Sequence, residues 1–124
     1  MKQHSNHFID LVTEAKKQIK EISSDTLNGM LEDGPPFYLI DVREAEELQS
    51  GWIPTAKHLS KGVIERDIEK SIPDFDAEIV VYCSGGFRSA LVAFNLQNMG
   101  YKKVASLKDG LRGWVDSGRT LVHS

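Results

Sequence analysis

The chain has 124 residues, of which 40% are hydrophobic and 27% charged, and a net charge of −3. These values predict one globular domain rather than a disordered chain, and the slight acidity argues against a nucleic-acid-binding protein, which needs a clustered basic face. The first ten residues, MKQHSNHFID, lack the apolar core of a signal peptide, and no apolar run reaches the ~18 residues of a membrane span. A single cysteine allows neither an internal disulfide nor a cysteine-rich zinc site. We therefore expect a cytoplasmic protein with no nucleic-acid or membrane partner.

The first predicted element is an amphipathic helix within residues 8–22, because apolar residues recur there at intervals of three and four. The residues with this spacing are Phe8, Leu11, Val12, Ala15, Ile19 and Ile22. We assign residues 1–22 to an N-terminal helical segment that packs on the domain or extends it, and residues 23–124 to the domain itself. Ser24 or Asp25 can cap a short second helix, which a Gly-Pro-Pro sequence ends.

The sequence predicts a short buried strand at residues 37–42 (FYLIDV), a second strand at 78–83 (EIVVYC), and a third strand followed by a turn within 102–110 (KKVASLKDG). The other segments predict a loop at 51–60 and short helices at 43–51, 63–72 and 111–118. Residues 88–100 predict a longer helix, with Gly100 just past its end. Alternating strands and helices are typical of an α/β fold with a mostly parallel central sheet and helices on both faces. Functional residues of such sheets gather at the carboxyl ends of the strands, where Asp41 and Cys83 lie.

The stretch IVVYCSGGFRSALVAF, residues 79–94, places Cys83 between an apolar strand and a helical run. Gly85 and Gly86 can adopt turn conformations closed to other residues, so that successive N–H groups point into one concavity behind which a helix begins. These amides, the helix dipole and Arg88 would stabilise a thiolate, which is itself the nucleophile and needs no histidine base. The competing interpretation is a buried structural cysteine, which would need neither the glycines nor the arginine.

Three charged residues near this stretch have structural and functional interpretations. Arg88 lies in the first turn of a predicted helix, where a cation is unfavourable, so we expect an anion beside it. Asp41 follows a strand and is either a turn or cap residue or a part of the site. For Arg43, a surface ion pair with the glutamates that follow it competes with a bracing role in the site.

The sequence CSGGFR at residues 83–88 resembles the active-site loop of the rhodanese family of sulfurtransferases. Three further stretches resemble segments of that family in the same order: LIDVREAEEL (39–48), GWIPTAKHLS (51–60) and LKDGLRGW (107–114). Three residues depart from the usual sequence of the family. Trp52 stands where histidine is usual, Thr55 stands where glycine is usual, and Asp109 replaces the first glycine of the closing pair.

The resemblance implies a single rhodanese-like domain in which Cys83 takes a sulfane sulfur from a donor and passes it, as a persulfide, to a thiol or cyanide acceptor. It implies a persulfide-binding loop that consists of Ser84, Gly85, Gly86, Phe87, Arg88 and Ser89. Asp41 and Arg43 would brace the site from the neighbouring strand end. No metal or other cofactor is expected. Because the loop has one basic residue and an apolar tip, thiosulfate and an organic or protein-borne persulfide are equally compatible donors.

Two other functions are left open by the sequence. A cysteine-dependent phosphatase or arsenate reductase uses the same strand–loop–helix arrangement, but with a C-x5-R loop, whereas Cys83 and Arg88 form C-x4-R, and the tighter loop suits a sulfur atom. A non-catalytic rhodanese-like binding module would not need the cysteine and arginine that this chain has. A thiol oxidoreductase would need a resolving cysteine, which the chain lacks.

Overall fold

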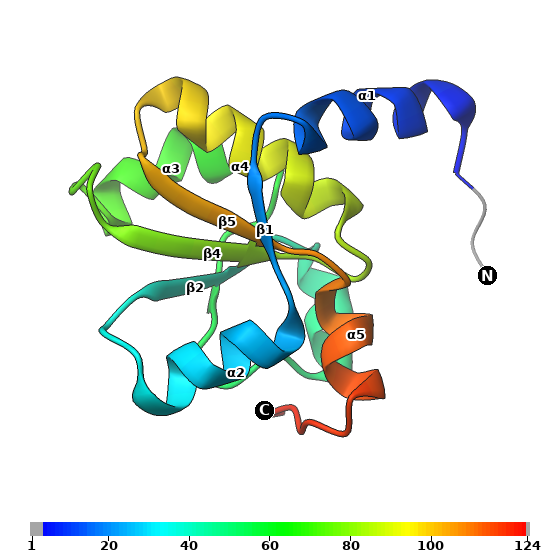
Figure 1. Ribbon diagram of the computed structural model, residues 1–124, viewed down its shortest axis with the longest axis vertical. Coiled ribbons are helices and arrows are strands. Elements are labelled where there is room, and N and C mark those ends of the chain that lie inside the picture. Colours follow the sequence, from blue (N-terminus) through cyan, green and yellow to red (C-terminus); the bar gives the residue numbers. More distant parts are fainter. Residues whose placement is uncertain (1–3, 124) are drawn as a thin grey trace.

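The computed structural model describes residues 4–123 and shows, within them, one parallel sheet with the strand order β1-β5-β4-β2-β3 (Figure 1). The strands are β1 (Lys20–Ile22), β2 (Tyr38–Asp41), β3 (Lys57–His58), β4 (Glu78–Tyr82) and β5 (Lys103–Leu107). The helices are α1 (Asn6–Lys16), α2 (Ser24–Asp33), the 3-10 helix η1 (Ala45–Ser50), α3 (Ile64–Ser71), α4 (Phe87–Met99) and α5 (Gly110–Asp116). The predicted α/β fold, with its parallel sheet, is confirmed.

Two hydrophobic cores lie on opposite faces of the sheet. Val80 and Val81 are neighbours on β4 and point to opposite faces, as the alternation of side chains along a strand requires. Val81 belongs to the core that α3 and α4 cover, with Leu96 of α4, whereas Val80 belongs to the core of α2 and α5, with Leu27 and Trp114. Helix α1 packs against α4 on the outside of the first layer (Figure 1). Within residues 4–123, no helix combines the length and apolarity that a membrane crossing requires.

The predicted helix within residues 8–22 is too long, because α1 ends at Lys16 and the chain then forms β1. This short strand pairs with β5 in parallel, with Ile22 opposite Leu107. Ile22 is buried as part of β1, and an apolar residue at this position fits a helix pattern as well as a buried strand, so the sequence spacing could not decide between the two. Backbone hydrogen bonding favours the strand. As an edge strand, β1 forms its backbone hydrogen bonds with β5, and its last carbonyl, that of Ile22, accepts the Lys108 N–H at 2.9 Å.

Two other local predictions need correction. The predicted loop at 51–60 contains β3, which pairs with β2 and is too short to show any alternation. The N-cap of α2 is Ser23, one residue before the predicted caps, and its hydroxyl accepts the Thr26 N–H at 3.1 Å. The end of α4 is as predicted, since Gly100 follows it in the left-handed conformation, with φ of 114°.

One departure from the family pattern has a visible conformational cost. Thr55 has φ of 74° and is the one non-glycine residue with positive φ in the described part of the chain. A β-branched residue is strained in this region, whereas the glycine that the family usually has at this position adopts it freely. The other departures, Trp52 and Asp109, have negative φ.

Candidate active site

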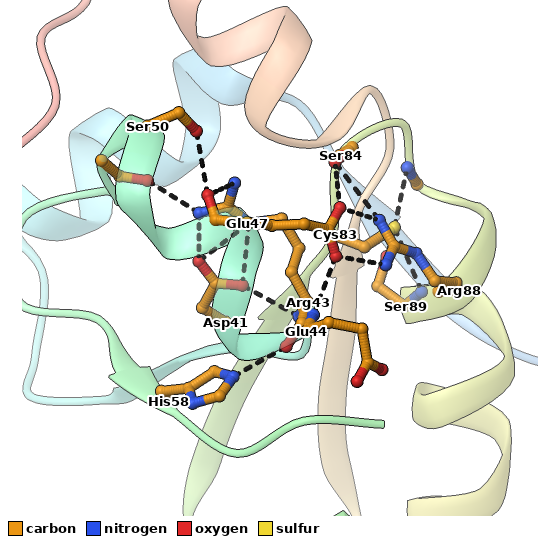
Figure 2. Close-up of polar contacts among 12 residues, drawn as sticks. Asp41, Arg43, Glu44, Glu47, Ser50, His58, Cys83, Ser84, Arg88 and Ser89 are labelled. Atoms are coloured by element: carbon orange, nitrogen blue, oxygen red, sulfur yellow. Dashed lines mark hydrogen bonds and ion pairs between the residues drawn. The ribbon is translucent and has the colours of Figure 1, made fainter. Parts of the chain in front are cut away.

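Cys83 directly follows β4, and its sulfur lies at the base of a loop that leads into α4 (Figure 2). The residue is 1% exposed. Its Sγ accepts the N–H groups of Gly86 at 3.2 Å and of Ser89 at 3.4 Å, and its thiol donates to the Ser89 hydroxyl at 3.6 Å. Both amides belong to the start of α4, so the sulfur lies where the helix dipole is positive. Two amides of the predicted loop thus point at the Cys83 sulfur.

The two glycines of the loop differ from each other, contrary to the prediction. Gly86 has φ of 92°, and a Cβ atom there would overlap the carbonyl oxygen of Lys108. Gly85 has no positive φ, and a Cβ atom there would meet only the Arg112 Nη1, at 3.7 Å. Gly86 is therefore required by conformation and close approach, whereas Gly85 leaves space at the rim of the loop.

A buried pair of hydroxyl groups lies beside the sulfur. Ser89 Oγ and Ser106 Oγ are 2.7 Å apart, and both residues are wholly buried. Ser106 comes from β5, in register with Val81 of β4. Because the Ser106 hydroxyl is hydrogen-bonded to the Ser89 hydroxyl, the Ser89 hydroxyl is fixed next to Cys83 and can donate to a thiolate. Ser89 was predicted from the sequence and Ser106 was missed; its only signal was a polar residue within an apolar strand.

The predicted anion beside Arg88 is Glu47, from η1. Arg88 donates from Nη1 to Glu47 Oε2 at 2.7 Å and from Nη2 to Glu47 Oε1 at 3.0 Å, and a further bond from Nη2 reaches the Ser84 hydroxyl at 3.2 Å (Figure 2). These hydrogen bonds from Arg88 lower the pKa of Glu47 from 4.5 to about 2. Hydrogen bonding to Glu47 likewise raises the pKa of Arg88. Both groups stay charged, and they neutralise each other at the rim of the loop.

At the end of the neighbouring strand β2, Asp41 and Arg43 form a buried ion pair instead of the surface pair weighed for Arg43. Their side chains are 1% and 2% exposed, and Arg43 Nη2 lies 2.8 Å from Asp41 Oδ2. Arg43 Nε lies 3.1 Å from both carboxylate oxygens. Burial alone would lower the pKa of Arg43, but the hydrogen bonds and charge of Asp41 outweigh it and raise this pKa.

The remaining donors of Arg43 reach the backbone around η1. Nη1 donates to the Glu47 carbonyl at 3.1 Å and Nη2 to the Gly51 carbonyl at 2.7 Å. His58, on β3, contacts the Arg43 carbonyl at 2.7 Å through Nε2. Glu47 is thus held by its backbone to the buried pair and by its side chain to Arg88 (Figure 2). Sequence reasoning missed Glu47 because an acidic run gives no sign of which carboxylate faces the loop.

The N-terminal segment covers the tip of the loop. The Phe87 ring lies 4.7 Å from the His4 ring and 6.1 Å from the Phe8 ring, measured between centroids. The ammonium group of Lys16 lies 5.3 Å from the Phe87 centroid. The apolar tip predicted at Phe87 is therefore packed against α1 and against His4, which lies two residues before that helix, and this places α1 next to the candidate site.

Helix α5 closes the other side of the loop. The N–H of Leu111 donates to the Cys83 carbonyl at 2.8 Å, and the N–H of Arg112 donates to the Ser84 carbonyl at 3.0 Å. Gly110 has φ of 62°, and a Cβ atom there would lie 2.5 Å from the Ser84 carbonyl oxygen. The stretch LKDGLRGW therefore contributes to the site by direct backbone contact, which the sequence alone did not reveal.

Comparisons with known proteins agree with this geometry. The sequence profile of the Rhodanese-like domain matches residues 23–117. YtwF of Bacillus subtilis, a candidate sulfurtransferase, is 40% identical over 97 residues, which cover 78% of this chain and 91% of YtwF. A sulfurtransferase of Allochromatium vinosum is 33% identical over 104 residues, or 84% of this chain and 95% of that protein.

A solved structure extends the likeness to almost the whole chain. A Rhodopseudomonas palustris protein of unassigned function, described as a candidate tyrosine phosphatase, has a TM-score of 0.87 and 27% identity, covering 98% of this chain and 99% of its own. The matching profile covers most of the chain and includes both the buried pair after β2 and the cysteine loop after β4. The predicted resemblance is therefore confirmed, and the chain belongs to the rhodanese-like domain family.

Proposed function

We propose that the protein is a sulfurtransferase in which Cys83 carries the sulfur. The Cys83 thiolate attacks the sulfane sulfur of a donor, a new Sγ–S bond forms, and the bond between that sulfur and the rest of the donor breaks. The bonding electrons leave with the donor remnant, which is sulfite from thiosulfate or a thiolate from an organic or protein persulfide. A thiol or cyanide then attacks the outer sulfur, so that the Sγ–S bond breaks and the Cys83 thiolate returns.

The observation that carries this proposal is the pair of amide donors on Cys83 Sγ. The N–H groups of Gly86 and Ser89 both point at the sulfur. Donors that are already oriented stabilise developing negative charge without reorganisation, so they favour the thiolate as both nucleophile and leaving group. The named activities of YtwF and of the Allochromatium vinosum protein are in line with the same chemistry.

Within this proposal, Asp41 and Arg43 have a bracing role and make no contact with the sulfur. They fix η1, and η1 presents Glu47 to Arg88. Arg88 in turn bonds Ser84, the residue next to the nucleophile. The proposed persulfide-binding loop, residues 84–89, is held from one side by this chain of contacts and from the other by α5.

A phosphatase is the second candidate, since the Rhodopseudomonas palustris structure is described in those terms. A phosphate dianion requires a guanidinium that is available for bidentate binding. Here both Nη atoms of Arg88 are bonded to Glu47, whose lowered pKa keeps it negative. Binding phosphate would leave that carboxylate unpaired next to a dianion, so the geometry disfavours a phosphatase.

The test measures both activities on the same samples. Thiocyanate formation from sulfur donors and cyanide should require Cys83, so that Cys83→Ser abolishes it while the folded state is retained. Hydrolysis of aryl phosphates should be absent. Insertion of one glycine between Gly86 and Phe87 widens the loop and should weaken sulfur transfer. If the native loop hydrolyses a phosphate ester faster than it transfers sulfur from any donor, the sulfurtransferase proposal is wrong.

A further inference from the structure

The charge at the mouth of the cysteine loop does not come from the arginine within the loop. Arg88 is bonded twice to Glu47 and once to Ser84, and its charge is matched by a carboxylate that stays ionised. An anionic substrate that approached Arg88 would have to displace Glu47 or lie beside its negative charge. Arg88 therefore shapes the loop, and the counter-charge for an anion has to come from another residue.

Arg112 is placed to supply that charge. Its backbone N–H is bonded to the Ser84 carbonyl at 3.0 Å, so the residue is anchored one position away from the nucleophile. Its guanidinium lies over Gly85, with Nη1 only 3.7 Å from the position that a Cβ atom would occupy there. The residue is exposed, and within residues 4–123 no carboxylate lies within ion-pair distance of its guanidinium. Among the described residues, the space beside Gly85 is thus free of other side chains within 4 Å and adjoins a cation that has no ion-pair partner.

We infer that Arg112 is a specificity-determining residue that binds the anionic group of a small sulfane-sulfur donor during transfer to Cys83. This inference rests on the proposed function. The favoured donors are thiosulfate-like compounds, in which a charged oxyanion group is bonded directly to the sulfane sulfur. The missing side chain at Gly85 gives such a group room next to the guanidinium, and Arg112 offers it paired N–H donors.

The transfer step with such a donor breaks one S–S bond and forms another. The Cys83 thiolate attacks the terminal sulfur of the donor, the S–S bond of the donor breaks, and the electron pair leaves on the oxyanion fragment. This fragment is sulfite from thiosulfate and a sulfinate from an arenethiosulfonate. The oxyanion group carries negative charge both in the bound donor and in the departing fragment, so a cation at the rim stabilises the two to a similar extent.

The test compares two donors of different charge, the thiosulfate dianion and the benzenethiosulfonate monoanion, on the full chain. Arg112→Gln should raise the KM for thiosulfate by about tenfold, the loss expected for one charge-assisted contact, and should change kcat much less. The KM for benzenethiosulfonate should rise by a smaller factor. Arg112→Lys, which keeps the charge but not the planar fork, should lie between the wild type and Arg112→Gln. Added salt should raise the KM of the wild type more than that of Arg112→Gln.

A matched control is Arg66→Gln, which removes one exposed positive charge from α3, on the opposite face of the sheet from α5. It should leave both KM values unchanged. If Arg112→Gln leaves the thiosulfate KM unchanged while transfer through Cys83 proceeds, the role of Arg112 is wrong and the sulfurtransferase function stands. An equal rise in KM for both donors in Arg112→Gln would also contradict the proposed role of Arg112. If the wild type takes sulfur from neither these donors nor persulfides, both proposals fail.

Discussion

Two strand ends lie next to each other at the carboxyl edge of the sheet and differ in what they leave available. At the end of β2, Asp41 and Arg43 are 1% and 2% exposed, and they satisfy each other and the backbone in and just after η1. After β4, Cys83 is equally buried, but its sulfur receives two amide donors at the base of a loop whose charged residues are at the rim. We call the β2 end the closed end, because its two charges satisfy each other, and the β4 end the open end, because we propose that its sulfur receives a substrate atom.

The two ends also differ in the environment of their ion pairs. In the Arg88–Glu47 pair the side chains are 29% and 33% exposed, so solvent screens their attraction and a substitution there should change the free energy of unfolding modestly. The Asp41–Arg43 pair is desolvated, so the loss of one partner leaves an uncompensated buried charge. Substitutions in the Asp41–Arg43 pair should therefore mainly affect folding, and substitutions in the Arg88–Glu47 pair should mainly affect sulfur transfer.

The largest expected effect on stability follows from Asp41→Asn, which leaves the Arg43 charge buried without a counter-charge. The free energy of unfolding should fall by about 3–5 kcal/mol, as measured by denaturant titration. Glu46→Gln is the control, because it neutralises an exposed carboxylate on the adjacent η1 and should change stability by less than about 0.5 kcal/mol. A loss in Asp41→Asn no greater than that in the control would show that the ion pair at the closed end does not stabilise the fold.

Gly86→Ala should cost less, but it should affect both folding and transfer. The new Cβ atom requires a left-handed backbone and overlaps the Lys108 carbonyl, so we expect a loss of about 1–3 kcal/mol and a displaced amide at the sulfur. Gly29→Ala is the matched control, since a Cβ atom there meets nothing within 4 Å and lies in α2, where alanine is about 0.5–1 kcal/mol more favourable. Thermal unfolding and thiocyanate formation would be measured on both. A Gly86→Ala protein as stable and active as Gly29→Ala contradicts the account.

Arg88→Ala should reduce the rate of sulfur uptake more than it reduces stability. It removes the bonds to Glu47 and Ser84, so the free energy of unfolding should fall by only about 1 kcal/mol. Sulfur uptake should slow by about tenfold, because the loop loses the contact that fixes the residue after Cys83. Arg88→Lys should restore part of the rate, since it keeps the charge without the paired donors. Wild-type uptake in Arg88→Ala would mean that the pair plays no part in transfer.

The smallest effect is a pH dependence of stability at Glu47. The pKa of this group is lowered from 4.5 to about 2, so it contributes stability above the unfolded value of 4.5 and loses it as the pH falls through about 2. The difference in unfolding free energy between wild type and Glu47→Gln should therefore be largest above pH 4.5 and shrink toward pH 2. Because all other acidic groups are common to both proteins, a difference that is constant over this range would contradict the charge pairing.

The sequence predicted the cysteine loop well because its determinants are local. The strand, the glycine at residue 86, the helix start and the need for an anion beside Arg88 can all be read within residues 79–94. The identity of that anion could not, because Glu47 reaches Arg88 across forty-one positions of sequence. Ser106 and Arg112 were missed for the same reason, since each meets the loop only after β5 and α5 have packed.

The same distinction holds for the fold. The long alternating segments predicted the parallel sheet and most helices. β1 and β3 escaped prediction because each has two or three residues and is defined by its partner strand rather than by its own pattern. The ion pair of Asp41 and Arg43 showed as two charged residues after a strand, and only the packing of η1 over them makes them buried.

Intact-mass measurement would show directly whether Cys83 accepts a sulfur atom. After incubation with thiosulfate or an organic persulfide, the wild-type chain should gain the mass of one sulfur atom, cyanide should remove it, and Cys83→Ser should show no gain. A gain that persists in Cys83→Ser, or a wild-type chain that takes up no sulfur from any donor, would contradict the account.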